Sequence, residues 1–221
     1  MKREVIETAD GSKTIYIPEM LENYHSNHGA LQEALHVFIK NGLQAFADKK
    51  EVHIFEMGFG TGLNAMLSMV EADRVNQKVY YTGIEAFPLE IEITQRIGYE
   101  ELVDYKFNNY FKEMHLSEWA KKHTFSDTFS FEKIHIKIQD YTVEEETFDL
   151  VYFDAFGPRA QQEMWGISIL EKMYRILKPG GVFVTYCAKG QVKRDLKALG
   201  FTLEILEGPP GKREMTRAIK S

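Results

Sequence analysis

The sequence is poor in cysteine and has no long apolar stretch. Its single cysteine, Cys187, has no second thiol with which to form a disulfide inside the chain, which is typical of a reducing compartment. The first residues include Glu4, Glu7 and Asp10, without an apolar run of signal-peptide length. No run elsewhere approaches the roughly 18 apolar residues that a membrane-spanning helix needs. We therefore expect a cytoplasmic protein with no membrane segment.

Positive charge is scarce over most of the chain but not at its C-terminal end. The formal net charge is −6, which argues against a protein that coats nucleic acid non-specifically. Residues 186–221, however, contain eight Lys or Arg and only four Asp or Glu. This end forms either a basic face that follows phosphates or an ordinary solvated surface.

Internal repeats, low-complexity tracts and long linkers are also absent, and strand-like segments alternate with helix-like ones. The 221 residues, 44% of them hydrophobic, suit one large domain with a single core. Such alternation predicts a mostly parallel sheet with helices on both faces. The expected elements are strands at 52–57, 79–85, 134–138, 148–154 and 182–187, helices at 63–72 and 164–177, and a C-terminal hairpin of 201–206 and 214–219.

Two stretches, residues 1–45 and 87–132, do not fit the alternation and are expected to shape the substrate site. Lys178-Pro179-Gly180-Gly181 is expected to end the second helix. The hairpin makes the last strand antiparallel. We thus expect a single α/β domain over residues 1–221, in which a Rossmann-like core of seven strands (52–221) carries an insertion around 87–132, and residues 1–45 lie on the substrate side.

A glycine-rich loop, Glu56-Met57-Gly58-Phe59-Gly60-Thr61-Gly62, closes the first expected strand. Its glycines allow a tight turn and a close approach of a ligand to the backbone, and the next helix points its N-terminal amides at the same place. In the dinucleotide fingerprint the third glycine follows the second by three residues, whereas here the gap is two. This spacing favours a zwitterionic methionine moiety over a pyrophosphate. Alternatively, the glycines serve turns only.

Acidic residues follow the next three expected strands. Glu85, 23 residues after Gly62, is placed where a carboxylate can accept two hydrogen bonds from a ribose diol. Asp140 is placed where an acid can accept a hydrogen bond from an adenine amino group, and Asp154 ends the fourth strand. Because the carboxyl ends of parallel strands meet at one edge, we expect the loop and these acids to line one site.

The motifs, in this order, resemble a known family over nearly the whole chain. The family is the methyltransferase half of the bifunctional tRNA 5-methylaminomethyl-2-thiouridine biosynthesis protein. The matching residues are Tyr24-His25-Ser26, Gly29-Ala30, Glu33, His36-Val37-Phe38-Ile39, Gly42-Leu43, Glu56 to Asn64, Phe153-Asp154-Ala155-Phe156-Gly157-Pro158, Met164-Trp165 and Gly211-Lys212-Arg213-Glu214-Met215.

The resemblance implies a class I S-adenosylmethionine-dependent methyltransferase. It implies methyl transfer to the primary amine of 5-aminomethyl-(2-thio)uridine at the tRNA wobble position, so the expected partner is tRNA through its anticodon loop. The family's flavin-dependent oxidase half has no counterpart in 221 residues, so no FAD is expected. The expected cofactor-binding residues are Glu56, Gly58, Gly60, Thr61, Gly62, Asn64, Glu85 and Asp140.

Two departures limit how far the family's tRNA contacts carry over. Gly157 stands where the family often has alanine, and residues 159–162 are local variation. Neither departure touches the reaction type.

Methylation of an amine requires a free nitrogen lone pair, yet an aliphatic amine with a pKa of about 10.4 is mostly protonated at neutral pH. A carboxylate beside the sulfonium can orient the amine and accept its proton, directly or through water. Asp154 is the expected base. The alternative is that it caps the next helix or holds a loop.

The remaining candidates surround this acid. Phe156 and Trp165 are expected to stack on a flipped uracil, although Trp165 could equally be core. Tyr24, His25, Ser26 and Glu33 are expected to fold over the cleft as substrate-binding residues, and Lys212 and Arg213 to touch phosphate or sugar. The residues His25, His28, Glu33 and His36 also allow a metal site, but the resemblance explains them without metal, so none is expected.

Two other functions remain open. A small-amine methyltransferase or a polyamine synthase on the same fold would also suit an acidic protein, but it needs no segment like Tyr24 to Leu43. A tRNA- or cofactor-binding module without catalysis is the second alternative.

Overall fold

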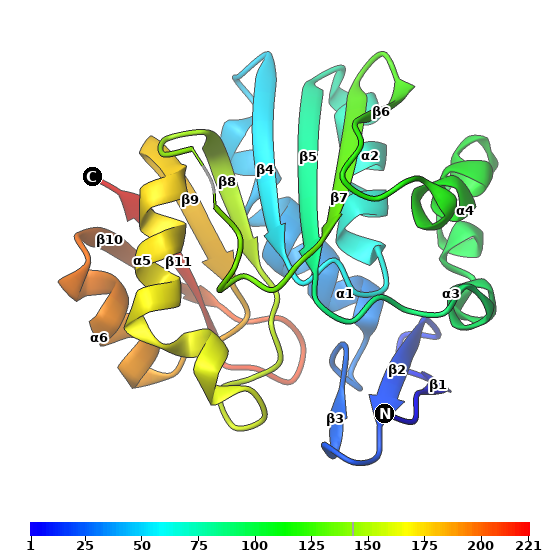
Figure 1. Cartoon of the computed structure of the whole chain (residues 1–221), viewed down its shortest axis with the longest axis horizontal. Helices are drawn as coiled ribbons and strands as arrows, with labels where there is room; N and C mark the ends of the chain where they lie inside the picture. Colours follow the sequence, from blue (N-terminus) through cyan, green and yellow to red (C-terminus); the bar gives the residue numbers. More distant parts are fainter. Residues whose placement is uncertain (143) are drawn as a thin grey trace.

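The computed structural model describes residues 1–142 and 144–221. Its centre is an eight-stranded sheet, seen face-on in Figure 1. The strands, in spatial order, are β10 (Phe201–Glu207), β11 (Glu214–Lys220), β9 (Leu177–Thr185), β8 (Phe148–Phe153), β4 (Glu51–Met57), β5 (Lys78–Glu85), β7 (Phe129–His135) and β6 (His123–Ser126).

The sheet has the predicted Rossmann-like character, with a parallel centre and an antiparallel C-terminal strand. β7, β5, β4, β8 and β9 are parallel neighbours, and β11 is antiparallel to both β9 and β10. The order reverses beside β4, the first strand of the core, and ligands bind at such switch points. The predicted C-terminal hairpin is confirmed.

The predicted count of seven strands is wrong, because β6 pairs antiparallel with β7 at the sheet edge. β6 lies inside the insertion expected at 87–132, and β7 begins five residues before the strand predicted at 134–138. The start of β7 was not predicted because Lys133 breaks its apolar alternation. This buried lysine occupies a core-facing position after Phe129 and Phe131. Its ammonium donates to the carbonyl of His115 at the end of α4 (Asn108–Leu116), where a cation stabilises the helix C-terminus.

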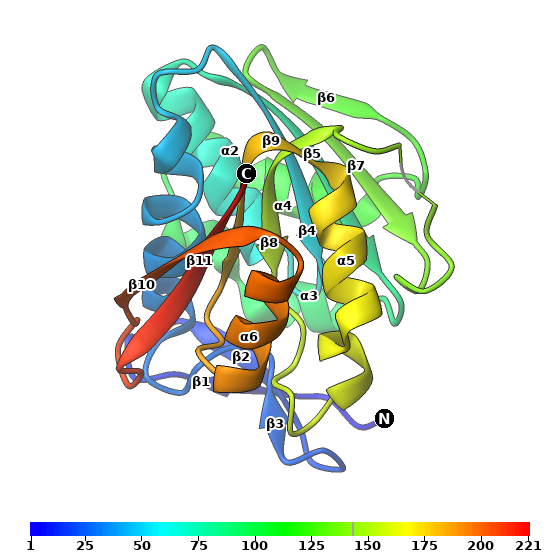
Figure 2. The ribbon, with the colours of Figure 1, turned by 90° about the vertical axis from the view of Figure 1, so that its left-hand side faces the viewer.

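Helices cover both faces of the sheet, as Figure 2 shows from the side. α5 (Ile167–Ile176) and α6 (Gly190–Ala198) pack on one face, in a core with Phe153, Phe183 and Trp165. The helices associated with the other core are α1 (Ala30–Ala34), the π-helix η1 (Leu35–Lys40), the 3-10 helices η2 (Leu43–Phe46), η3 (Tyr99–Leu102) and η4 (Tyr105–Phe107), and α2 (Leu63–Val75), α3 (Ile91–Ile97) and α4.

The predicted helix at 164–177 is shorter in the structure and is preceded by a separate turn. The 3-10 helix η5 (Gln162–Trp165) comes first, and Gly166, in an extended conformation, separates it from α5, which ends at Ile176. Lys178-Pro179-Gly180-Gly181 lies at the start of β9, where the register with β8 shifts, and Gly180 has a φ of +74°. The motif therefore forms an irregularity in the strand instead of a separate turn.

The N-terminal segment builds a small antiparallel sheet of its own from β1 (Glu4–Glu7), β2 (Lys13–Ile17) and β3 (Glu22–Asn23). Figure 1 shows this sheet on the side of the molecule to which the arrowheads of β4, β8 and β9 point. It buries Ile15 and Ile17. The segment thus lies at the carboxyl edge of the central sheet. Among the described residues, no helix combines the length and apolar character needed to cross a membrane.

Candidate active site

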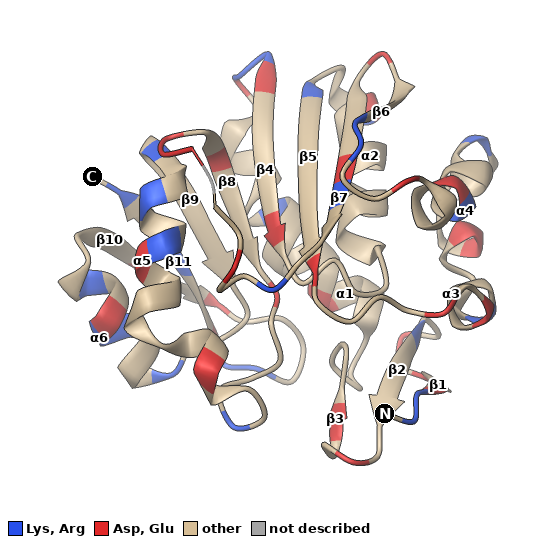
Figure 3. Cartoon of the chain, viewed as in Figure 1, with Lys and Arg blue, Asp and Glu red and all other residues tan. Residues whose placement is uncertain are grey.

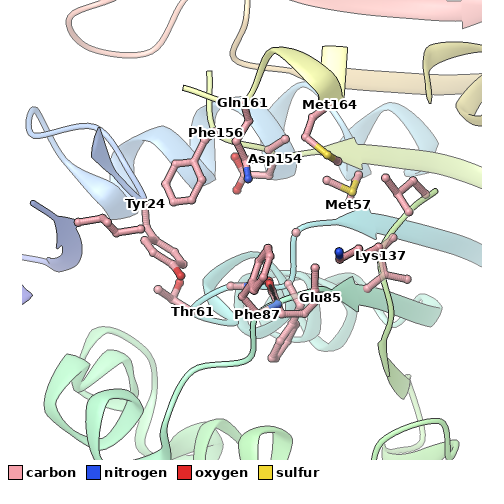
Figure 4. Close-up of a pocket in the computed structure, with 18 of the residues that line it drawn as sticks. Tyr24, Met57, Thr61, Glu85, Phe87, Lys137, Asp154, Phe156, Gln161 and Met164 are labelled. Carbon is pink, nitrogen blue, oxygen red and sulfur yellow. Dashed lines mark hydrogen bonds between the residues drawn. The ribbon is translucent and has the colours of Figure 1, made fainter. Parts of the chain in front are cut away.

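A cavity of about 500 Å³ opens at the carboxyl ends of β4, β5 and β8. Its size is within the range of about 300–1,000 Å³ that ligand sites in proteins occupy. Figure 4 shows Asp154, Phe156 and Gln161 on one side and Glu85 and Phe87 facing them. The loops after three parallel strands and the N-terminal segment therefore meet at one site, as the sequence predicted.

The glycine loop adopts backbone conformations that other residues rarely take. Gly58, Gly60 and Gly62 have φ values of +92°, +50° and +78°. The amides of Gly58 and Phe59 both donate to the carbonyl of Ile84, at 3.1 and 2.9 Å, which folds the loop over the end of β5. A Cβ on Gly58 would lie 2.9 Å from the carbonyl oxygen of Asp154. The glycines thus let the loops after β4 and β8 touch.

Glu85 ends β5 and lines the cavity. One carboxylate oxygen accepts from the amide of Gly60 at 2.9 Å, and the other accepts from the amide of Phe87 at 2.8 Å. Two backbone contacts therefore fix the carboxylate before any ligand arrives. Asp140 also lines the cavity and is exposed, following β7 at a greater distance along the chain. Both acids lie where the sequence placed them, while their ligands stay a prediction.

Asp154 follows β8 directly and turns its carboxylate to the cavity. One of its oxygens accepts from the side-chain amide of Asn64 at 2.9 Å. Burial and then the charge of Glu33 raise the pKa of Asp154 to about 7, against the lowering effects of the Asn64 hydrogen bond and of Lys212. The carboxyl therefore exchanges protons near neutral pH, which suits a general base.

Glu56 and Gly62 do not line this cavity, although both were predicted to bind the cofactor. Glu56 is fully buried, because its side chain points from β4 toward α2, where it accepts from the Asn64 amide at 2.9 Å. Burial raises the pKa of Glu56 well above its usual range. Gly62 is the residue before α2 and lies against Phe59 and His115. Their position supports the loop, whereas Gly58, Gly60, Thr61 and Asn64 line the cavity.

Tyr24 and His25 bring the N-terminal segment to the cavity wall. Tyr24 meets Phe156 edge to face, with 5.1 Å between ring centroids. The ring of His25 is 3.0 Å from the hydroxyl of Thr14 and 3.5 Å from that of Thr61 in the glycine loop. Burial lowers the pKa of His25 to about 4, so its imidazole is neutral at pH 7. His25 connects two segments.

Ser26, Glu33, Lys212 and Arg213 lie outside the cavity lining. Glu33 accepts from the backbone amide of Ser26 at 3.0 Å and from the ammonium of Lys212. The Lys212 ammonium also lies 3.8 Å from the centroid of the Tyr186 ring. Arg213 is almost fully exposed. These residues form a neighbouring layer, close enough to Asp154 that the charges of Glu33 and Lys212 shift its pKa.

The two aromatic residues predicted to stack on a base have different positions. Phe156 lines the cavity, but Trp165 does not. The indole of Trp165 is buried, packs edge to face on Phe153, and donates to the carbonyl of Phe156 at 2.8 Å. The predicted stacking role of Trp165 is therefore corrected to a structural one, because its ring fills the core and fixes the loop that carries Phe156.

Several residues that line the cavity were not predicted. Phe87, two residues beyond Glu85, is an exposed aromatic at the rim, and Gln161 comes from the stretch dismissed as local variation. The signal for Phe87 was its place directly after a strand end. Met164 belongs to a matching motif but had no predicted role, and Lys137 had no signal, because only the fold of the loops after β7 and β8 brings them to the cavity. Among the described residues, no three His, Cys, Asp or Glu side chains are arranged to hold a metal ion.

The lining fits S-adenosylmethionine. Gly58 and Gly60 give a backbone surface free of side chains, where a Cβ on Gly60 would approach the Tyr24 ring to 3.3 Å. Carboxylates at Glu85 and Asp140 can accept from hydroxyl and amino groups, as a nucleoside requires.

Known proteins are similar to this chain over most of its length. The tRNA 5-methylaminomethyl-2-thiouridine biosynthesis bifunctional protein MnmC of Cupriavidus metallidurans is 30% identical over 97% of this chain, and that of Actinobacillus pleuropneumoniae is 28% identical over 87%. The chain spans about a third of their length, 33% and 31% respectively.

Two solved structures are also similar to this chain. That of MNMC2 from Aquifex aeolicus matches with a TM-score of 0.80 and 26% identity, covering 98% of this chain and 70% of that one. CalS10, an amino pentose methyltransferase from Micromonospora echinaspora solved with S-adenosylmethionine bound, matches with a TM-score of 0.52 and 13% identity, over 87% of this chain and 92% of that one, which shows the fold alone. Residues 98–221, more than half of the chain, match a family model described as S-adenosyl-L-methionine-dependent methyltransferase. The chain therefore belongs to the S-adenosyl-L-methionine-dependent methyltransferases.

Proposed function

We propose that this methyltransferase acts on tRNA, methylating the primary amine of 5-aminomethyl-(2-thio)uridine at the wobble position, with Asp154 as the base. The observation that carries the proposal is the position of Asp154, at the cavity edge and with a pKa of about 7. The relatives named for this tRNA modification match 87% to 97% of the chain, which supports the substrate class.

Asp154 accepts a proton from the substrate ammonium, and the freed nitrogen lone pair then attacks. S-adenosylmethionine supplies an activated methyl group, whose bond to sulfur breaks as the bond to nitrogen forms. The product is a secondary ammonium, so charge passes from the sulfonium to the nitrogen. The Asn64 amide holds the Asp154 carboxylate in one orientation throughout, at 2.9 Å. Positioning of this kind supplies much of the acceleration of a displacement reaction.

The base of the nucleotide is recognised by the aromatic pair of Tyr24 and Phe156. Phe156 follows Asp154 by two residues, so a uracil against its ring would bring a substituent at C5 toward the carboxylate. The edge-to-face contact between Tyr24 and Phe156 holds both rings. Glu85 and Asp140 bind the ribose and adenine of the methyl donor at the other end of the cavity.

The test is mass analysis of nucleosides from tRNA carrying 5-aminomethyl-2-thiouridine, incubated with the protein and S-adenosylmethionine. We expect one added methyl on that nucleoside, and none on the carboxymethylated precursor. Asp154→Asn should lower the rate about 100-fold or more while leaving S-adenosylmethionine affinity within about 2-fold. Asp140→Asn is the matched control and should mainly weaken cofactor binding.

An unchanged rate for Asp154→Asn would overturn the assignment of the base. Absence of methyl transfer to tRNA, with S-adenosylmethionine still bound, would refute tRNA as the substrate. Free amines and polyamines would then be the substrates to test. A protein that binds both ligands and methylates neither would be a binding module.

A further inference from the structure

A second hollow, which we call the basic groove, lies beside the reaction cavity and shares no lining residue with it. It has a volume of about 570 Å³ and is formed by the loops after β8 and β9, the β10–β11 turn and Glu22. Only a short piece of chain separates the two hollows: Phe156 lines the cavity and its neighbour Gly157 lines the groove. The Tyr186 hydroxyl fixes this piece by donating to the carbonyl of Ala155 at 2.7 Å.

The groove is cationic although the whole chain is acidic. Its charged lining residues are Arg159, Lys189, Lys212, Arg213, Glu22 and Glu214. The Glu214 carboxylate is neutralised by Lys193 at 2.7 Å, and Lys212 is paired with the buried Glu33. Figure 3 shows further Lys and Arg on the neighbouring helix α6. Glu22 is then the one lining acid without an ion pair in the described part of the chain.

Three of the cations remain available to a ligand. Arg159 and Lys189 are exposed, and neither forms an ion pair with any residue in the ranges 1–142 and 144–221. Arg213 is 94% exposed and makes only a long contact of 3.9 Å with Glu214. Lys212 is different, because its ammonium is held by Glu33 and by the Tyr186 ring. The free positive charge therefore lies on three separate loops that surround the groove.

The floor between these cations is apolar. Pro158, Tyr186, Cys187 and Ala188 line it, and Cys187 is buried. A groove with a cationic rim and an apolar, partly aromatic floor suits a single-stranded nucleic acid, whose phosphates meet the cations while sugars and bases cover the floor. Phosphate contacts of this kind hold an RNA strand in register without reading its sequence.

We propose that the basic groove holds the sugar-phosphate backbone of the anticodon loop beside the wobble nucleotide, with Arg159, Lys189 and Arg213 as its phosphate contacts. This inference rests on the proposed function, because the base that enters the cavity belongs to that strand. A nucleotide whose base lies against Phe156 has its own backbone next to Gly157, and thus in the groove. The proposal also gives Arg213 and Lys212 different roles. Arg213 contacts RNA, whereas Lys212 stabilises the protein beside the active site.

The test compares the triple variant Arg159→Ala, Lys189→Ala, Arg213→Ala with a matched control, Lys50→Ala, Lys112→Ala, Lys122→Ala. The control removes the same charge from exposed lysines outside the groove. Binding of a fluorescein-labelled anticodon stem-loop RNA is followed by anisotropy at several salt concentrations. We expect the groove variant to bind about 10- to 100-fold more weakly, with the slope of log affinity against log salt reduced by about 2, and the control to bind as the unmodified protein does.

Catalysis and cofactor binding provide the second readout. In the groove variant, KM for tRNA should rise while kcat at saturation and S-adenosylmethionine affinity stay within about 2-fold, since phosphate contacts position the strand without taking part in methyl transfer. Equal losses of RNA binding in both variants, or unchanged binding and salt slope in the groove variant, would overturn the proposal. Because RNA binding needs no methyl transfer, weaker binding by the groove variant together with no methylation by the unmodified protein would refute the proposed function alone.

Discussion

At the scale of single residues, Asp154 is placed where catalysis and stability make opposite demands. Burial, followed by the charge of Glu33, raises the pKa of Asp154 to about 7, far above its value in an unfolded chain. Between about pH 4 and pH 7 the native carboxyl therefore holds a proton that the unfolded chain has released. The contribution of Asp154 to the free energy of unfolding is therefore fully present below pH 4 and is lost as the pH rises through 7.

This asymmetry predicts that Asp154→Asn stabilises the protein in a pH-dependent manner. The neutral amide can still accept from Asn64 and carries no charge to bury. We expect little difference from the unmodified protein at pH 4, and at pH 8 a gain of about 1–2 kcal/mol, or about 3–6 °C in Tm. This gain is smaller than the free energy that corresponds to the whole pKa shift, because Asp154 is partly open to the cavity. Thermal melts across this pH range are the measurement, and a gain of equal size at both pH values would contradict the explanation.

At the scale of an element, the glycine loop after β4 is shaped by its contact with the loop after β8. Gly58 combines a φ of +92° with a virtual Cβ 2.9 Å from the Asp154 carbonyl, so a side chain there must push on backbone. Gly180 has a similar φ of +74°, but nothing lies within 4 Å of its virtual Cβ. The two positions thus separate backbone strain from close packing.

Gly58→Ala should therefore cost about 2–4 kcal/mol of stability and displace Asp154, lowering both cofactor affinity and the methylation rate. Gly180→Ala should cost only the strain of the left-handed conformation, about 1–2 kcal/mol, with unchanged cofactor affinity. Calorimetric titration with S-adenosylmethionine and thermal melts measure both quantities. Equal cofactor affinity in the two variants would show that contact between the loops does not shape the site.

At the scale of the whole molecule, an ion pair joins segments that lie far apart in the sequence. Glu33 belongs to α1 and Lys212 to the β10–β11 turn, and the side chain of Glu33 is only 7% exposed. The pair flanks the active site, since the charge of Glu33 raises the pKa of Asp154 and that of Lys212 lowers it. Segments near the two ends of the chain thus influence the pKa of the proposed base.

Removal of either partner should shift the pH dependence of methylation in opposite directions. Lys212→Met leaves Glu33 unpaired, raises the pKa of Asp154 and moves the rising limb of the pH–rate profile to higher pH. Glu33→Gln should move it to lower pH. Lys212→Met should also cost about 2 kcal/mol, or about 4–8 °C in Tm, and the double variant should recover part of that loss. Shifts of the same sign in both single variants would contradict a direct electrostatic effect.

Sequence patterns were sufficient for features that depend on neighbouring residues. The glycine loop, the acids Glu85 and Asp154 at strand ends and the C-terminal hairpin lie as predicted, because buried parallel strands are apolar runs that end at one edge. β6 was not predicted. β7 was predicted to begin five residues too late, because a lysine that donates to the end of α4 stands at a core-facing position and looks like a polar break in the pattern. No local pattern distinguishes such a lysine from one on the surface.

The sequence by itself thus determined the fold class and the edge of the sheet where the cofactor loop lies, since these follow from periodicity and local motifs. Its motifs also carried the resemblance to the methyltransferase family. Only the tertiary structure decided which candidates line the cavity. It placed Phe156 there and buried Trp165, and it paired Lys212 with Glu33 while leaving Arg213 exposed. The physical reason is that the direction of a side chain depends on the packing of elements distant in sequence, which periodicity does not encode.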